Sequence, residues 1–201
     1  MLRCAITDGT AAGSVNAVQI DYLQNQVRRW ARDGINFIQL REKNLEAGAL
    51  FTLAEAAMQT LREMQSSTRL LINTRADVAV AAKTHGVHLT SRADELTPQQ
   101  VRGLFAYCGL SSPVVSVSCH TAEEVTGARD NEADLILFGP IFEKHISGRH
   151  LVNGVGLDLL EESCRLAQDL PVLAIGGVTS MNAPACLTAG AAGIAGIRTF
   201  A

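Results

Sequence analysis

The stretch FIQLREK, residues 37–43, opens with four residues typical of a buried strand and closes with three charged ones. On a strand, alternate side chains point to the same face, so Gln39, Arg41 and Lys43 are expected to face one way. An amide and two cations on one face indicate an anionic ligand. The alternative is that Arg41 and Lys43 lie past the strand end in solvent, with Glu42 as an intrachain partner.

Apolar runs of this kind recur along the chain and alternate with longer amphipathic stretches, which is the pattern of repeated βα units. Eight runs are expected to be strands: RCAIT (3–7), FIQL (37–40), LLIN (70–73), GVHL (86–89), VVSVS (114–118), LILF (135–138), VLAI (172–175) and GIAGI (193–197). Helices are expected at 20–33, 47–64, 77–83, 97–105, 121–129, 156–167 and 181–189. The sequence therefore predicts one α/β domain over residues 1–201, a (β/α)8 TIM barrel whose eighth helix is truncated or absent.

Composition narrows the kinds of partner. A chain of 201 residues that is 47% hydrophobic can bury one substantial core. Its net charge of −3 and lack of a basic cluster indicate no nucleic acid and no anionic membrane as partner. Residues 1–20 lack the pattern of a leader or a membrane span, so a cytoplasmic protein is expected. The five cysteines form no CxxC pair, which indicates reduced thiols.

The active site of a (β/α)8 barrel lies at the C-terminal ends of its strands. The segment AIGGVTS, residues 174–180, places Gly176 and Gly177 in a turn after the seventh run and before a helix. Exposed amides at a helix start bind phosphate, so a phosphate site is expected there. Gly196 and Arg198 follow the eighth run and are expected to contribute to it. The alternative is that the two glycines serve only a tight turn.

Six segments taken together resemble the thiamine phosphate synthase superfamily over nearly the whole chain. They are QLREK (39–43), INTRADVA (72–79), GVHL (86–89), SCHTAEEV (118–125), FGPIF (138–142) and AIGG (174–177). The resemblance implies a (β/α)8 barrel that acts on thiazole phosphates in thiamine biosynthesis. It also implies a phosphorylated thiazole as the small-molecule partner and a homo-oligomer, a dimer, as the assembly.

The synthase branch of that superfamily joins a hydroxymethylpyrimidine pyrophosphate to a thiazole phosphate and uses magnesium held by aspartates. This chain departs from the synthase pattern at both aspartates, with Thr74 at the first and Ala93 at the second, and Asp94 stands one position off. Ser147 stands where that pattern has a pyrophosphate-binding lysine. Because magnesium binds through carboxylates, no magnesium site is expected at Asn73, Thr74 and Ala93.

The resemblance is closer to the TenI-type thiazole tautomerases, which lack the metal aspartates and carry a histidine matching His120, two residues after Ser118. Their reaction aromatises a thiazole carboxylate phosphate by moving a proton, a task that suits histidine. The resemblance thus implies His120 as catalytic residue, with Ser118 orienting it or the substrate. The expected substrate contacts are Gln39, Arg41, Lys43, Asn73, Gly176, Gly177, Gly196 and Arg198. No cofactor is expected, and magnesium only if the synthase alternative holds.

Two alternatives stay open: a thiamine phosphate synthase, and a non-catalytic protein that binds a thiazole phosphate in a regulatory role. The other histidines are expected to have lesser roles. His88 is expected to pack inside the barrel, and His85 to lie at the opposite face. His145 and His150 occupy a polar loop, residues 143–153, that could close as a lid.

Overall fold

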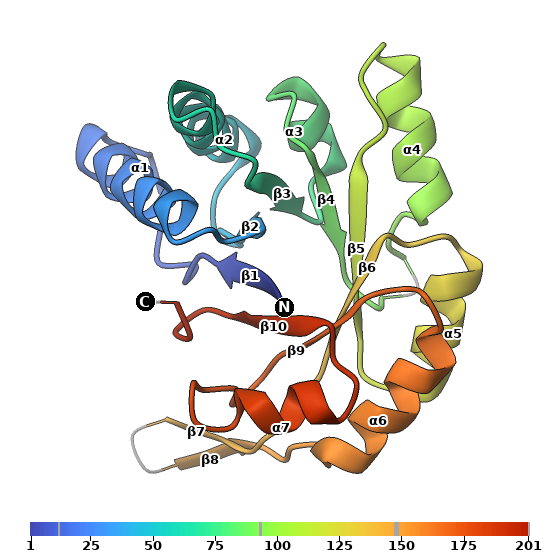
Figure 1. Cartoon of the computed structure of the whole chain (residues 1–201). Helices are drawn as coiled ribbons and strands as arrows, with labels where there is room; N and C mark the ends of the chain where they lie inside the picture. The colour runs from blue at the N-terminus through green and yellow to red at the C-terminus, as the bar shows by residue number, and fades with distance from the viewer. Residues whose placement is uncertain (12, 93, 147–148, 201) are drawn as a thin grey trace.

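The eight predicted strands form a closed, all-parallel barrel in the computed structural model, which describes residues 1–11, 13–92, 94–146 and 149–200 (Figure 1). Around the barrel the order is β1-β10-β9-β6-β5-β4-β3-β2. The strands are β1 (Leu2–Ile6), β2 (Phe37–Leu40), β3 (Arg69–Asn73), β4 (Gly86–Leu89), β5 (Val114–Cys119), β6 (Leu135–Phe138), β9 (Val172–Ala174) and β10 (Gly193–Gly196). The predicted (β/α)8 barrel is confirmed.

Seven helices among the described residues pack around the barrel (Figure 1). They are α1 (Ala17–Arg32), α2 (Ala47–Glu63), α3 (Ala76–Ala81), α4 (Pro98–Tyr107), α5 (Ala122–Asp130), α6 (Gly156–Ala167) and α7 (Ala183–Thr188). α1 begins earlier than predicted because Asn16 and Gln19 form a reciprocal cap, each side chain accepting from the backbone N–H of the other.

No helix follows β10 among the described residues. Instead the carbonyl oxygen of Phe200 accepts hydrogen bonds from Trp30 Nε1 at 2.9 Å and from the guanidinium of Arg29 at 3.1 Å. Both donors belong to α1, so the segment after the last strand is fastened to the first helix. Trp30 is itself fully buried between α1 and the barrel. The seam between β1 and β10 is thereby covered on its α1 side.

The barrel interior is apolar on one side and polar on the other. Strands β1, β6, β9 and β10 contribute an apolar cluster of Cys4, Ile6, Leu135, Leu137, Leu173 and Ala195. Strands β2 to β5 contribute the buried polar residues Gln39, Asn73, His88 and Ser116. A second apolar layer lies between the strands and the helices, with Trp30, Phe105 and Phe138 among its largest buried side chains.

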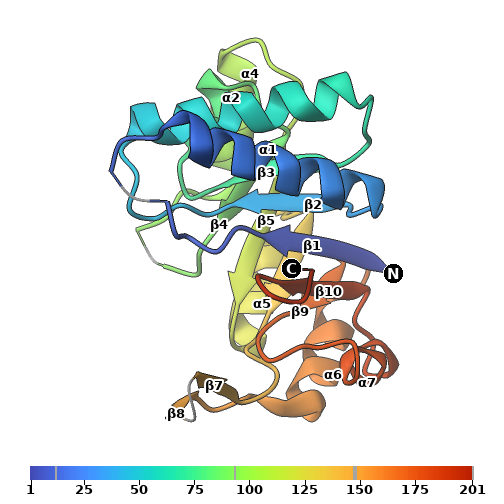
Figure 2. The same ribbon diagram turned by 90° about the vertical axis from the view of Figure 1, so that its left-hand side faces the viewer.

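An antiparallel hairpin that the sequence did not predict, β7 (Lys144–Ile146) and β8 (Arg149–Val152), follows β6. It lies on the side of the barrel toward which β1 and β2 point (Figure 2). Its base is closed where Val155 N donates to Pro140 O at 2.8 Å and Gly156 N donates to Ile141 O at 3.0 Å. Its strands, KHI and RHLV, begin with polar residues and form no apolar run of the kind that predicted the barrel strands.

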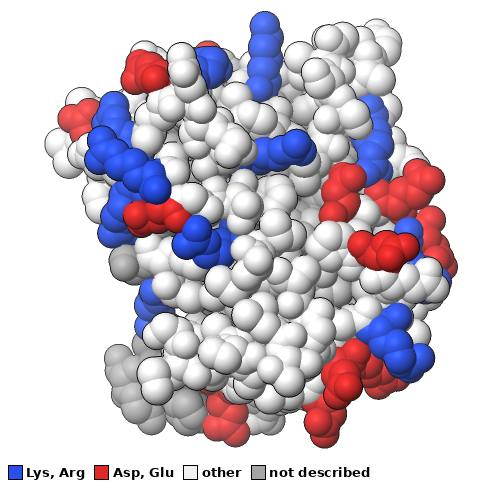
Figure 3. Space-filling model, in the orientation of Figure 1, with Lys and Arg blue, Asp and Glu red and all other residues white. Residues whose placement is uncertain are grey.

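The charged side chains on the face shown in Figure 3 are of both signs and interspersed, and they do not gather into one basic patch. Within the described part of the chain, every helix is too short or too polar to span a lipid bilayer. All five cysteines are free, and Cys4, Cys119 and Cys186 are buried. Burial raises the pKa of the Cys4 thiol to about 12, which leaves it protonated near neutral pH.

Candidate active site

Gln39 points into the barrel, as the opening stretch suggested, but β2 ends at Leu40. The predicted strand face carrying Gln39, Arg41 and Lys43 is therefore wrong for the two cations, which belong to the following loop. Gln39 is 2% exposed and donates from Nε2 to Asn73 Oδ1 at 2.8 Å. Its Oε1 is buried and has no hydrogen-bond partner among the described residues. A buried acceptor without a donor is costly, so this oxygen is a candidate ligand contact.

The residues after β2 point in different directions. Arg41 is half-buried, and its backbone N–H donates to Thr7 Oγ1 at 2.9 Å. Lys43 is exposed. Glu42 is only 8% exposed, and its Oε2 accepts from Ala11 N at 3.0 Å, so it is not the solvated partner of its neighbours. In this loop the two cations are therefore more exposed to solvent than the carboxylate of Glu42.

His88 lies inside the barrel, as predicted, and is 3% exposed. Its Nδ1 is 2.8 Å from Ser116 Oγ, and its Nε2 is 2.9 Å from Ser118 Oγ. Burial, with a smaller contribution from the charge of Arg41, lowers the pKa of His88 to about 3. The ring is therefore neutral at physiological pH. The hydrogen bond recorded for Ser118 goes to His88, so the prediction that Ser118 orients His120 has no contact to support it.

His120 follows β5 at the barrel mouth, where the sequence places it, and its side chain is exposed. Its Nδ1 forms a short hydrogen bond with the carbonyl oxygen of Gly139, which follows β6. A carbonyl only accepts, so Nδ1 carries the proton. In the neutral ring, Nε2 then holds a lone pair. His120 can therefore take up and return a proton at Nε2.

The glycine turn after β9 is required by its packing. Gly176 has φ +87° and Gly177 has φ +66°, a left-handed region that favours glycine. A Cβ on Gly176 would lie 2.5 Å from the Cα of Pro140, and one on Gly177 would lie 2.7 Å from the Cβ of Phe142. Among the described residues, neither glycine N–H has a recorded hydrogen-bond acceptor. The turn thus combines a steric need for glycine with two free donors.

The helix expected next to this turn begins later than predicted, at Ala183. Thr179 N donates to Asn182 Oδ1 at 2.7 Å, and Asn182 Nδ2 donates to Gly177 O at 3.0 Å. These bonds hold a separate turn over residues 179–182, so the free amides do not belong to a helix start. A phosphate here would be bound by the glycine turn itself.

The loops after β9 and β10 meet, as the sequence predicts. Thr199 Oγ1 donates to Val178 O at 3.0 Å, which joins the segment containing Gly196 and Arg198 to the glycine turn. Arg198 is exposed at this junction.

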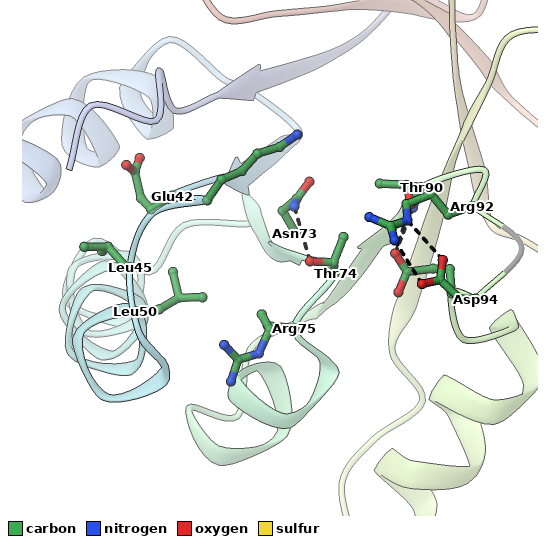
Figure 4. A pocket seen from close by; sticks show the side chains of 11 residues that line it. Glu42, Leu45, Leu50, Asn73, Thr74, Arg75, Thr90, Arg92 and Asp94 are labelled. Atoms are coloured by element: carbon green, nitrogen blue, oxygen red, sulfur yellow. Dashed lines mark hydrogen bonds and ion pairs between the residues drawn. The ribbon is translucent and has the colours of Figure 1, made fainter. Parts of the chain in front are cut away.

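A cavity of about 500 Å³ opens on the other side of the mouth, over the loops after β2, β3 and β4 (Figure 4). Its lining residues are Glu42, Lys43, Leu45, Leu50, Asn73, Thr74, Arg75, Thr90, Arg92, Asp94 and Glu95. The sequence predicted Lys43 and Asn73 at a ligand site. The sequence analysis did not predict Arg75 and Arg92 at this site. Each lies shortly after the end of a strand, Arg75 after β3 and Arg92 after β4, and that position is the signal that could have identified them.

The residues of this cavity do not fit a magnesium ion. Asp94 forms an ion pair with Arg92 at 2.9 Å, and Glu95 accepts from the hydroxyl of Thr90 at 3.0 Å. Thr74 offers no carboxylate. Within the described residues, no group of three or more His, Cys, Asp or Glu is placed to hold a metal. Ala93, the third position of the metal prediction, lies outside the described residues, as does Ser147, which stands where the synthase pattern has a pyrophosphate-binding lysine.

The fold places the chain in the class of (β/α)8-barrel proteins, whose small-molecule sites lie at the C-terminal ends of the strands. The profile of the TMP-TENI family, described as thiamine monophosphate synthase, matches residues 6–200. The chain belongs to this family.

Two relatives agree with that family, and a solved structure agrees with the fold. A putative thiamine-phosphate synthase of Geobacter sulfurreducens is 39% identical over 163 residues, covering 81% of this chain and 71% of that protein. The thiamine-phosphate synthase of Roseiflexus castenholzii is 35% identical over 193 residues, covering 94% and 76%. The structure of a thiamine phosphate pyrophosphorylase from Pyrococcus furiosus superposes with a TM-score of 0.76 at 24% identity, covering 98% of this chain and 85% of that one. These relatives are named as synthases, and the tautomerase branch that the sequence favours stays a prediction.

Proposed function

We propose that this protein is an enzyme of thiamine biosynthesis that binds a phosphorylated thiazole at its barrel mouth. Membership of the thiamine monophosphate synthase family over residues 6–200 supports the pathway. The free amides of Gly176 and Gly177 support a phosphate site, because backbone N–H groups in a left-handed turn form an anion-binding concavity. Arg198 adds a positive charge from the adjoining loop.

The reaction best supported is that named for the relatives, in which a pyrimidine pyrophosphate and a thiazole phosphate give thiamine phosphate and free pyrophosphate. The observation that carries this proposal is the 35% identity to a thiamine-phosphate synthase over 94% of the chain. The unpartnered Gln39 Oε1 is a buried acceptor that suits an N–H donor on a heterocycle. No magnesium-dependent step is assigned, since the cavity residues do not fit that ion.

A second candidate, a thiazole tautomerase, is favoured by the geometry of His120. The hydrogen bond of Nδ1–H to Gly139 O leaves Nε2 of the exposed, neutral ring with a lone pair that can act as a base. In this reaction His120 would remove the ring proton beside the substrate carboxylate and return a proton to the exocyclic carbon. Arg41 and Lys43 would bind the carboxylate.

Two assays on the purified protein separate these candidates. In the first, both thiamine precursors are supplied with and without magnesium, and pyrophosphate and thiamine phosphate are measured. In the second, a thiazole carboxylate phosphate is supplied and its aromatisation is followed by NMR. Product in the first assay supports the transferase, and product only in the second supports the tautomerase. A protein that binds thiazole phosphate but gives no product in either is a binding protein.

Variants locate the proton-transfer residue. Because positioned acid–base catalysis contributes about 10²–10⁴-fold, His120→Ala should lower kcat for aromatisation by that order and leave phosphate affinity nearly unchanged. Arg41→Ala should mainly raise KM, since it removes a contact present in ground and transition states alike. Full aromatisation by His120→Ala would remove this residue from the mechanism.

A further inference from the structure

Three cations line the cavity over β2 to β4: Lys43, Arg75 and Arg92. Figure 4 shows Thr74 between Arg75 and Arg92 in that view. The cations come from three successive strand-end loops, so they approach the same space from three directions.

The two arginines are held in the same manner. Arg75 donates from Nε to Asp77 Oδ1 at 2.8 Å and from its guanidinium to Asp77 Oδ2 at 2.5 Å. Arg92 donates to Asp94 Oδ1 at 3.0 Å and to Asp94 Oδ2 at 2.9 Å. Each guanidinium thus already binds a planar, two-oxygen anion through two parallel bonds, which is the geometry that carboxylate and phosphate share.

These ion pairs are weak enough for a ligand to replace. Both side chains of the Arg92–Asp94 pair are 72% exposed, and the Arg75–Asp77 pair is also open to solvent. Water and salt screen exposed pairs, so either arginine can turn to a stronger anion at little cost. Lys43 has no partner recorded among the described residues and needs no such exchange.

The carboxylates that line the cavity are less available to a ligand than its cations are. Glu42 is committed to the backbone N–H of Ala11, and Glu95 to the N–H and hydroxyl of Thr90. Asp94 is paired with Arg92 and is the carboxylate of the lining that a ligand anion would displace. The groups left to meet a ligand are therefore cationic, although positive and negative residues are equal in number around the cavity.

We propose that this cavity binds the diphosphate group of a substrate directly through Lys43, Arg75 and Arg92, without a divalent cation. The inference rests on the proposed transferase function, whose leaving group is pyrophosphate. Two guanidinium forks and one ammonium supply the charge that magnesium supplies where carboxylates are present. Arg92 is the residue that most directly replaces the metal, because its ion pair with Asp94 is the more exposed of the two arginine pairs.

Calorimetry with inorganic pyrophosphate tests the proposal, once in EDTA and once in excess magnesium. We expect saturable binding in EDTA, with a Kd that magnesium does not improve. Arg92→Gln and Arg75→Gln should each weaken binding about 10-fold or more, because each removes a charge-assisted bidentate contact. Asp94→Asn should tighten binding a few-fold, because it frees Arg92 from its competitor.

Matched controls lie away from the mouth. Arg165→Gln removes an exposed cation on α6, and Asp130→Asn loosens the Arg129–Asp130 pair at the end of α5. Neither should change the Kd for pyrophosphate. Binding that appears only with magnesium, or that survives both Arg92→Gln and Arg75→Gln unchanged, would overturn the proposal.

The outcomes separate this inference from the proposed function. Pyrophosphate binding in EDTA with no product from the two thiamine precursors would leave the cationic site standing and remove the transferase. Magnesium-dependent product formation together with no binding in EDTA would keep the transferase and remove the cationic site.

Discussion

The two halves of the barrel mouth are made in different ways. Over β6, β9 and β10 the rim is backbone: Gly176 and Gly177 pack against Pro140 and Phe142 with no room for a Cβ. Over β2 to β5 the rim and the interior below it are side chains, such as Gln39 bonded to Asn73 across neighbouring strands. The first half holds its shape through close approach, and the second through hydrogen bonds between replaceable groups.

This difference sets which positions of the rim can be substituted without disturbing the packing. A glycine that a left-handed turn and a tight contact both require cannot change without moving its neighbours. A carboxylate at the end of a loop can become Thr74 while the barrel keeps its register. Packing therefore constrains the half of the rim that holds Gly176 and Gly177, and the other half is free to change its chemistry.

The largest expected effect on stability comes from a glycine-to-alanine substitution in the half of the rim that is made of backbone. Gly176→Ala would place a Cβ against Pro140 and force alanine into a left-handed conformation. We expect a loss of about 3 kcal/mol or more in the free energy of unfolding, measured by urea denaturation. The control is Gly103→Ala in α4, where a Cβ meets nothing within 4 Å and alanine should stabilise the helix. Equal stability of the two variants would show that the turn yields easily.

A smaller effect on the free energy of unfolding should come from a change of pH that protonates His88, which lies in the half of the barrel whose rim is made of side chains. The pKa of His88 is about 3 in the folded protein and about 6.5 when unfolded, so the unfolded state binds the extra proton between these values. Its contribution is therefore fully present above pH 6.5 and is lost as the pH falls. Between pH 7 and pH 5 this loss is about 2 kcal/mol.

His88→Gln removes that titration, and comparison of the two proteins cancels other groups such as His85. We expect the free energy of unfolding of the wild type to fall by about 2 kcal/mol more than that of His88→Gln over this range. Parallel pH profiles would mean that the ring is not held neutral by burial.

The smallest expected effect, of opposite sign, is at Thr74. Its φ of +59° is left-handed, which is unfavourable for a β-branched residue and better tolerated by asparagine. Thr74→Asn should therefore raise the free energy of unfolding by about 1 kcal/mol. Thr52→Asn at an exposed position of α2 is the control and should change stability little. A destabilised Thr74→Asn would show that the threonine methyl or its bond with Asn73 outweighs the strain.

Most of the fold could be predicted because it depends on local pattern. Each of the eight apolar runs became a barrel strand, and Thr97 and Thr121, the first residues of two predicted helices, cap those helices by accepting from Gln100 N and Glu124 N. The start of α7 was predicted too early because Asn182 closes a turn onto Gly177, a contact that no periodicity reveals.

The position of the candidate site could be predicted more readily than the hydrogen-bond partners of its residues. Strand ends gave His120 and the glycine turn, because parallel strands bring their C-terminal ends to one rim. The partners of Gln39, Glu42 and Ser118 depend on which strand lies beside which and on side-chain direction. Glu42 in particular looked like a surface charge, yet it is withdrawn to bind a backbone N–H of the loop after β1.

The closed base of the β7–β8 hairpin separates the length of this loop from the geometry of the barrel. The excursion leaves the barrel at Ile141 and returns at Gly156, and hydrogen bonds join those two points directly. The distance that the excursion must span is therefore nearly zero and does not depend on its length, so loops of different size cost the fold only a slowly rising closure entropy. The hairpin at the rim of the mouth can therefore change in length and sequence while the barrel strands keep their register.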